Sequence, residues 1–129
     1  MSSAQTPRSF DPPRRRPVPT EFFVTNPDGS ESLQKVGDGT LIVIVKDNCN
    51  GCADFVANRD QILSDLLVVT ASRTASETYG ALYAPDFITQ IDARFAPVYL
   101  LAGGSPLEVV TEGTVFSAEQ VQAEIAPLL

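Results

Sequence analysis

The sequence predicts an α/β domain in which a mixed central sheet lies between helical layers, a three-layer α/β/α sandwich. Residues 41–45 form an unbroken apolar, mostly β-branched run, which is typical of a strand covered on both faces. Residues 53–65 then place Phe55, Val56, Ile62 and Leu63 on one face of a predicted helix. Residues 66–69 read as a second buried strand, so the segment predicts a strand–helix–strand unit.

The remaining elements follow from local signals. Residues 22–25 predict an opening strand, and the turn sequence at 26–29 follows it. Ser76 is a candidate cap for a short helix that Gly80 and Pro85 interrupt, and a second short helix is predicted over 86–94. Two strands at 98–101 and 107–110 are joined by a glycine-containing turn, as in a β-hairpin. A capping box at 117–120 opens the last helix. The predicted order is β, β, α, β, α, β, β, α.

The first 20 residues differ in composition from the rest of the chain. They hold five of the ten prolines and four arginines, which predicts an extended or disordered arm at 1–20 and a folded domain at 21–129. The run Arg14-Arg15-Arg16 is expected to be solvated. Contact with an acidic partner or a membrane surface is the alternative.

The charge and the hydropathy of the chain limit the kinds of partner that are expected. The net charge is −7, and because the arm carries +3, the remainder carries −10. Such an acidic domain would repel a phosphate backbone, so no nucleic-acid partner is expected. No run of 18 apolar residues is present, so no membrane span is expected. The N-terminus lacks a secretory h-region, so the chain as written is expected in the cytoplasm, or exported if a signal or anchor was removed.

The chain contains two cysteines and no histidine. Catalysis by Ser-His-Asp or Cys-His is therefore excluded, and two cysteines alone cannot complete a tetrahedral zinc site. No spacing typical of a calcium-binding loop appears. No metal or bound cofactor is expected.

The two cysteines form the motif Cys49-Asn50-Gly51-Cys52 between the central strand and the next helix. The unpaired N–H groups and partial positive charge of a helix N-terminus stabilise a thiolate, so Cys49 is predicted to be the nucleophile. Cys52 lies within one turn and can resolve a mixed disulfide. A structural disulfide is the alternative, although closing so short a loop stabilises little. We therefore expect a redox-active pair.

Together these residues resemble the thioredoxin-like superfamily from about residue 19 to residue 129. The resemblance is closest to the branch of TlpA-like disulfide reductases and MauD-type proteins, which is related to the AhpC/TSA group. It implies a thioredoxin-like sandwich and dithiol–disulfide exchange with protein substrates, supplied with electrons by an upstream thiol protein. The segment 96–101 resembles the family's cis-proline strand. This implies that Pro97 is cis and faces the cysteines, and that the backbone of Ala96 pairs with an extended substrate.

Several positions depart from the family pattern. Asn48 stands where most relatives have an aromatic residue, and Val43 stands where many bury an acid that moves the proton of the second thiol. Asp47 and Asp54 are close in sequence but are expected to be solvated; if they lay near the sulfurs, their negative charge would raise the thiol pKa. These departures keep open a second hypothesis, a binding module of the same fold without turnover.

A third hypothesis is a peroxiredoxin-like peroxidase. It fits less well, because Lys46 occupies the position where those relatives have Thr or Ser. The aromatic residues Tyr79, Tyr83 and Phe87 are expected in the core rather than on a substrate-binding surface.

Overall fold

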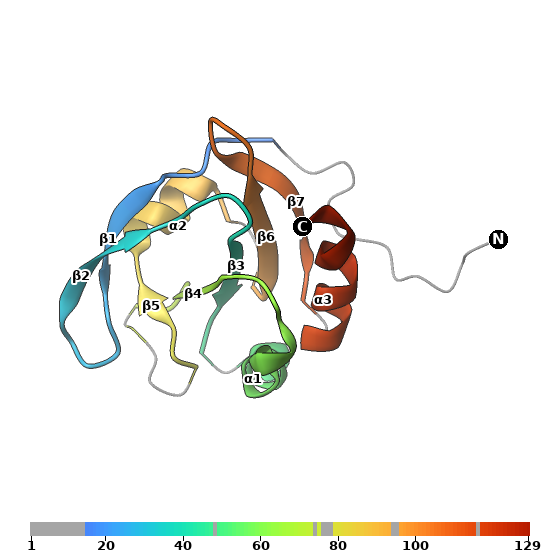
Figure 1. Cartoon of the computed structure of the whole chain (residues 1–129). Helices are drawn as coiled ribbons and strands as arrows, with labels where there is room; N and C mark the ends of the chain where they lie inside the picture. Colours follow the sequence, from blue (N-terminus) through green and yellow to red (C-terminus); the bar gives the residue numbers. More distant parts are fainter. Residues whose placement is uncertain (1–14, 48, 74, 76–78, 94–95, 116) are drawn as a thin grey trace.

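The computed structural model describes residues 15–47, 49–73, 75, 79–93, 96–115 and 117–129, and shows a seven-stranded mixed sheet with three α-helices (Figure 1). The order across the sheet is β2-β1-β5-β4-β3-β6-β7. The strands are β1 (Glu21–Thr25), β2 (Glu31–Lys35), β3 (Leu41–Val45), β4 (Leu66–Thr70), β5 (Leu82–Tyr83), β6 (Val98–Gly103) and β7 (Glu108–Thr114), and the helices are α1 (Asn50–Ala57), α2 (Pro85–Ile91) and α3 (Ala118–Ile125), with short 3₁₀ turns η1 (Arg59–Gln61) and η2 (Ala126–Leu128).

Helices cover both faces of the sheet, which confirms the predicted sandwich. Helix α2 lies on one face, and α1 and α3 lie on the other (Figure 1). Side chains of β3 alternate between the two resulting core clusters: Ile42 and Ile44 pack on the α2 side, and Val43 packs on the side of α1 and α3. All five residues of β3 have no exposed surface, as expected for a central strand.

The central pairings also agree with the sequence. Strands β3 and β4 are parallel, in register from Leu41 opposite Leu66, and α1 connects them. Strand β6 is antiparallel to β3 and forms the predicted hairpin with β7. Ser117 caps α3, since its side chain accepts a hydrogen bond from the backbone N–H of Gln120 at 3.1 Å.

Helix α1 is shorter at its C-terminal end than the sequence predicts. It runs from Asn50 to Ala57 and ends at Asn58, where the chain enters the 3₁₀ turn η1. The helical spacing therefore does not extend to Leu63, which is 84% exposed, so its predicted inward position is wrong. Helix α2 begins one residue before its predicted start, at Pro85, because proline is tolerated where the helix has no partner for its N–H. The predicted helix start at Ser76 lies outside the described residues.

Strands β2 and β5 are additions to the predicted order. Strand β2 pairs with β1 along its whole length, from Glu21 opposite Lys35 to Thr25 opposite Glu31. The turn between them is closed by a hydrogen bond from the N–H of Asn26 to the carbonyl of Ser30, at 2.7 Å. The side chain of Asp28 accepts hydrogen bonds from the hydroxyl and backbone N–H of Ser30, which lower the pKa of that carboxyl.

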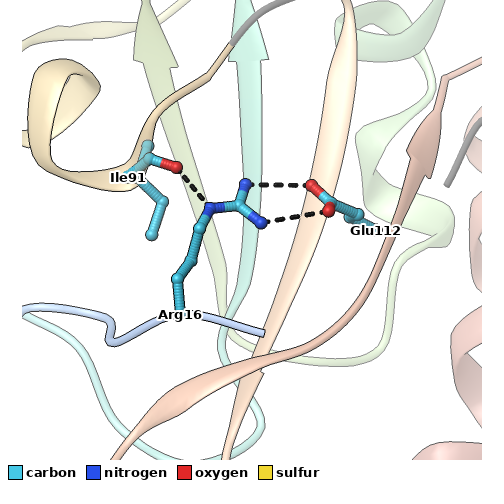
Figure 2. A network of polar contacts seen from close by, with 3 residues as sticks. All are labelled: Arg16, Ile91 and Glu112. Carbon is cyan, nitrogen blue, oxygen red and sulfur yellow. Dashed lines mark hydrogen bonds and ion pairs between the residues drawn. The ribbon is translucent and has the colours of Figure 1, made fainter. Parts of the chain in front are cut away.

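The end of the predicted arm belongs to the folded structure. Residues 15–18 run along β7, where the N–H of Val18 donates to Leu107 and the N–H of Val109 donates to Arg16, both at 3.0 Å. The Arg16 side chain is not solvated as predicted. It makes a bidentate ion pair with Glu112 at 2.9 and 3.0 Å and also donates to the carbonyl of Ile91 (Figure 2). Residues 1–14 lie outside the described residues.

No helix in the described part of the chain is long and apolar enough to cross a membrane.

Candidate active site

The two cysteines form a disulfide at the N-terminus of α1. Strand β3 ends at Val45, and Cys49 is the N-cap residue of α1, with an extended backbone (φ −117°, ψ 108°). The Cα atoms of Cys49 and Cys52 are 5.2 Å apart, and the Cys49 sulfur accepts the backbone N–H of Cys52 at 3.3 Å. A sulfur thus takes the place that Ser or Asp oxygens occupy at many helix N-termini. It is held where the helix supplies donors and positive potential.

The two sulfur-bearing residues differ in burial. Cys52 has 0% exposed surface and packs among core residues that include Val43 and Phe55, whereas Cys49 is half-buried. An incoming molecule can therefore reach Cys49 more easily than Cys52. This asymmetry suits a reaction in which an outer thiol is attacked or attacks, and an inner thiol acts within the chain.

Pro97 lies beside the disulfide-bearing turn. A Cβ atom placed on Gly51 would be 3.4 Å from the Pro97 ring carbon Cγ, an ordinary van der Waals contact, so Pro97 lies directly against the first turn of α1. The peptide bond between Ala96 and Pro97 is cis, and the Pro97 carbonyl accepts the N–H of Val115 at 3.5 Å. The structure thus brings the four predicted site residues to one end of the sheet.

Charged residues close to the motif in sequence point into solvent. Lys46, Asp47 and Asp54 are all exposed, as the sequence predicted for the two aspartates. Val43 is completely buried behind the motif, so an aliphatic side chain occupies the position of the family's buried acid. Asn48 lies outside the described residues. Among the described residues, no group of three or more Cys, Asp or Glu side chains is arranged to hold a metal ion.

Tyr79 is a site residue that sequence reasoning assigned only to the core. It is 9% exposed and packs in the cluster that contains Cys52, as predicted for a core aromatic. In addition, its hydroxyl donates to the carbonyl oxygen of Cys49 at 3.5 Å. That carbonyl also accepts the N–H of Ala53 at 3.1 Å. Tyr79 therefore helps to fix the peptide at the N-cap, across a separation of 30 residues that no local pattern reveals.

We expect Tyr79→Phe to lower the free energy of unfolding of the oxidised protein by about 0.5–1.5 kcal/mol, the usual net value of one hydrogen bond. Urea unfolding monitored by circular dichroism measures this. The matched control is Tyr83→Phe, a half-buried tyrosine of β5. Equal losses in the two variants would contradict a specific role for the bond to Cys49.

Comparison with known proteins decides the fold. The chain is similar in structure to a thio-disulfide isomerase from Thermus thermophilus, with a TM-score of 0.61 and 14% identity over 87% of this chain and 94% of that one. The chain has the thioredoxin-like fold. It is also similar to the thioredoxin domain of a thiol-disulfide oxidoreductase from Bacteroides vulgatus, with a TM-score of 0.56 and 10% identity over 88% and 95% of the two chains.

A third similar structure is an uncharacterized thioredoxin-like protein from Porphyromonas gingivalis, with a TM-score of 0.50 and 16% identity over 86% of this chain and 88% of that one. No protein-family model matches the sequence, and no curated protein matches it significantly. The thioredoxin-like resemblance seen in the sequence is thus confirmed at the level of fold. Membership of the TlpA-like and MauD-type branch stays a prediction.

Proposed function

We propose that this protein is a thiol–disulfide oxidoreductase that exchanges the Cys49–Cys52 pair with cysteines of protein substrates. The observation that carries the proposal is the disulfide at the N-terminus of α1, with half-buried Cys49 outside and fully buried Cys52 inside. The structural similarity to a thio-disulfide isomerase and to a thiol-disulfide oxidoreductase domain supports it.

In the reducing direction, the Cys49 thiolate attacks one sulfur of a substrate disulfide. A mixed disulfide forms, and the first substrate sulfur leaves as a thiolate. Cys52 then loses its proton and attacks the Cys49 sulfur, which releases the second substrate thiolate and closes the Cys49–Cys52 disulfide. Two electrons have passed to the substrate, and a second dithiol protein must return them. The reverse sequence oxidises a substrate dithiol.

The residues around the motif suit these roles. The backbone N–H of Cys52 and the positive end of α1 stabilise negative charge on the Cys49 sulfur. Ala96 and Pro97 are half-buried, and Pro97 lies beside Gly51, so the two residues would shape the groove that receives an extended segment of substrate. No bound cofactor takes part in this scheme.

The second candidate is a binding module of the same fold. Buried Val43 favours it, because no carboxylate at that position can take the proton of Cys52.

A turnover assay distinguishes the oxidoreductase from the binding module. We expect the wild-type protein to accelerate insulin reduction by dithiothreitol, and Cys49→Ser to fall to the uncatalysed rate. The assay follows turbidity of the insulin B chain. Wild-type protein that is no faster than Cys49→Ser would reject exchange and leave the binding module.

A further inference from the structure

Strand β2 forms one outer edge of the sheet, and an exposed apolar patch spans β2 and its neighbour β1. The outer side of β2 has no strand partner in the described part of the chain. Phe23 and Leu33 lie directly opposite each other on β1 and β2, and they are 79% and 44% exposed. Their neighbour Phe22 points the other way and stacks on Phe87 of α2, with ring centroids 4.3 Å apart. The patch of Phe23 and Leu33 therefore faces away from α2.

The hydrogen-bond pattern of the hairpin fixes which groups of β2 face outward. Residues 26 and 30 at one end, and residues 20 and 36 at the other, are bonded pairs, since Asn26 donates to Ser30 and Val36 donates to Thr20. Bonded and non-bonded pairs alternate along an antiparallel ladder. Ser32 and Gln34 therefore direct their backbone groups to β1.

The intervening residues of β2 direct their N–H and C=O groups away from the sheet: Glu31, Leu33 and Lys35. The Gln34 side-chain amide donates to the Lys35 carbonyl at 2.9 Å. A carbonyl oxygen accepts two hydrogen bonds, so this contact leaves capacity for another strand. The edge thus offers three evenly spaced donor–acceptor pairs.

We propose that β2 pairs with β2 of a second copy of this chain, antiparallel and centred on Leu33. In this register Leu33 lies opposite Leu33 of the second copy, and each Glu31 lies opposite a Lys35. All outward backbone groups meet in bonded pairs, and the two Phe23–Leu33 patches join into one apolar surface across the two-fold axis. Shifting the strands by two residues would instead place Leu33 opposite Glu31 or Lys35. Charge and apolar contacts therefore select the same register.

The predicted dimer is weak, because a five-residue strand buries much less surface than the roughly 1,600 Å² of a standard interface. We expect a dissociation constant on the order of 0.1 mM. The net charge of −7 makes two copies repel, so the measurement belongs at about 0.15 M salt, where the screening length is about 8 Å.

Charge exchange tests the register. Sedimentation velocity from about 10 µM to about 1 mM should show a monomer–dimer equilibrium for the wild-type protein. Glu31→Lys and Lys35→Glu should each weaken it at least about ten-fold, because each places like charges opposite each other twice. Mixing the two variants should restore association as a heterodimer. The matched control is Glu119→Lys, the same charge change at an exposed position of α3, which should dimerise as the wild type or slightly better.

Amide hydrogen exchange gives a second reading that does not depend on any variant. The N–H groups of Glu31, Leu33 and Lys35 should become protected as protein concentration rises, while those of Ser32 and Gln34 stay protected throughout. A wild-type protein that remains monomeric at about 1 mM overturns the proposal. So does a dimer that the two charge variants leave intact, or a mixture of them that fails to associate.

Discussion

Replacing Arg16 with alanine should lower the free energy of unfolding by about 3–5 kcal/mol, the usual cost of removing one partner of a buried ion pair. The Glu112 side chain is 1% exposed and the Arg16 side chain 13%. Figure 2 shows the two terminal guanidinium nitrogens directed at the two carboxylate oxygens, and Nε directed at the Ile91 carbonyl. That carbonyl closes α2 and has no partner within the helix, so Arg16 satisfies two buried acceptors at once.

Urea unfolding of the oxidised protein measures this loss, and Arg15→Ala is the matched control. Arg15 pairs with Glu108, but these side chains are 59% and 40% exposed, so we expect a change of about 0.5 kcal/mol or less. Combining Arg16→Met with Glu112→Leu should recover most of the stability, because the buried charge is then absent. Similar losses for Arg15→Ala and Arg16→Ala would show that the buried pair is not the cause.

The second large effect concerns the mixed disulfide. We expect nearly all covalent complexes that Cys52→Ser forms with substrate proteins to persist, because the residue that releases them is missing. Reduced Cys52→Ser, mixed with an extract treated with a mild oxidant, should give bands on non-reducing gels that disappear on reduction. Mass spectrometry of each band should find Cys49 as the linked residue.

Cys49→Ser provides the control, since it keeps a thiol at residue 52. Cys52 has no exposed surface, so this variant should give few or no complexes. Equal trapping by the two variants would mean that the inner sulfur is as accessible as the outer one. The assignment of Cys49 as the attacking residue would then be wrong.

The central part of the fold could be predicted because its residues carry strong local signals. The apolar run of β3, the helical spacing after it and the capping box of α3 each depend on a few neighbouring residues. Strand β2 could not be predicted in this way. It contains a single apolar residue, Leu33, and both of its faces are largely exposed, so it shows no alternation. Its conformation depends on the turn and on pairing with β1.

Much of the candidate site could be predicted as well. The cysteines stand between a buried strand and a helix, which identifies a helix N-terminus from the sequence alone, and family resemblance adds the position of Pro97. Contacts between distant segments could not be predicted. Arg16 lies 96 residues from Glu112 in a segment whose composition is typical of solvated chain. Tyr79 reaches Cys49 across 30 residues. A single sequence carries no signal for either pairing.

The path of residues 15–18 makes the two sides of the sheet unequal. These residues lie beside the start of β7 and occupy part of that edge, whereas no strand of the described residues lies on the outer side of β2. A chain with two equally adhesive flanks can add neighbours indefinitely and grow into fibres. In the proposed dimer, the exposed edge of β2 in each molecule would pair with the same edge of the second copy. Association through β2 would therefore stop at a symmetric dimer, and this would keep the exposed edge strand from forming fibres.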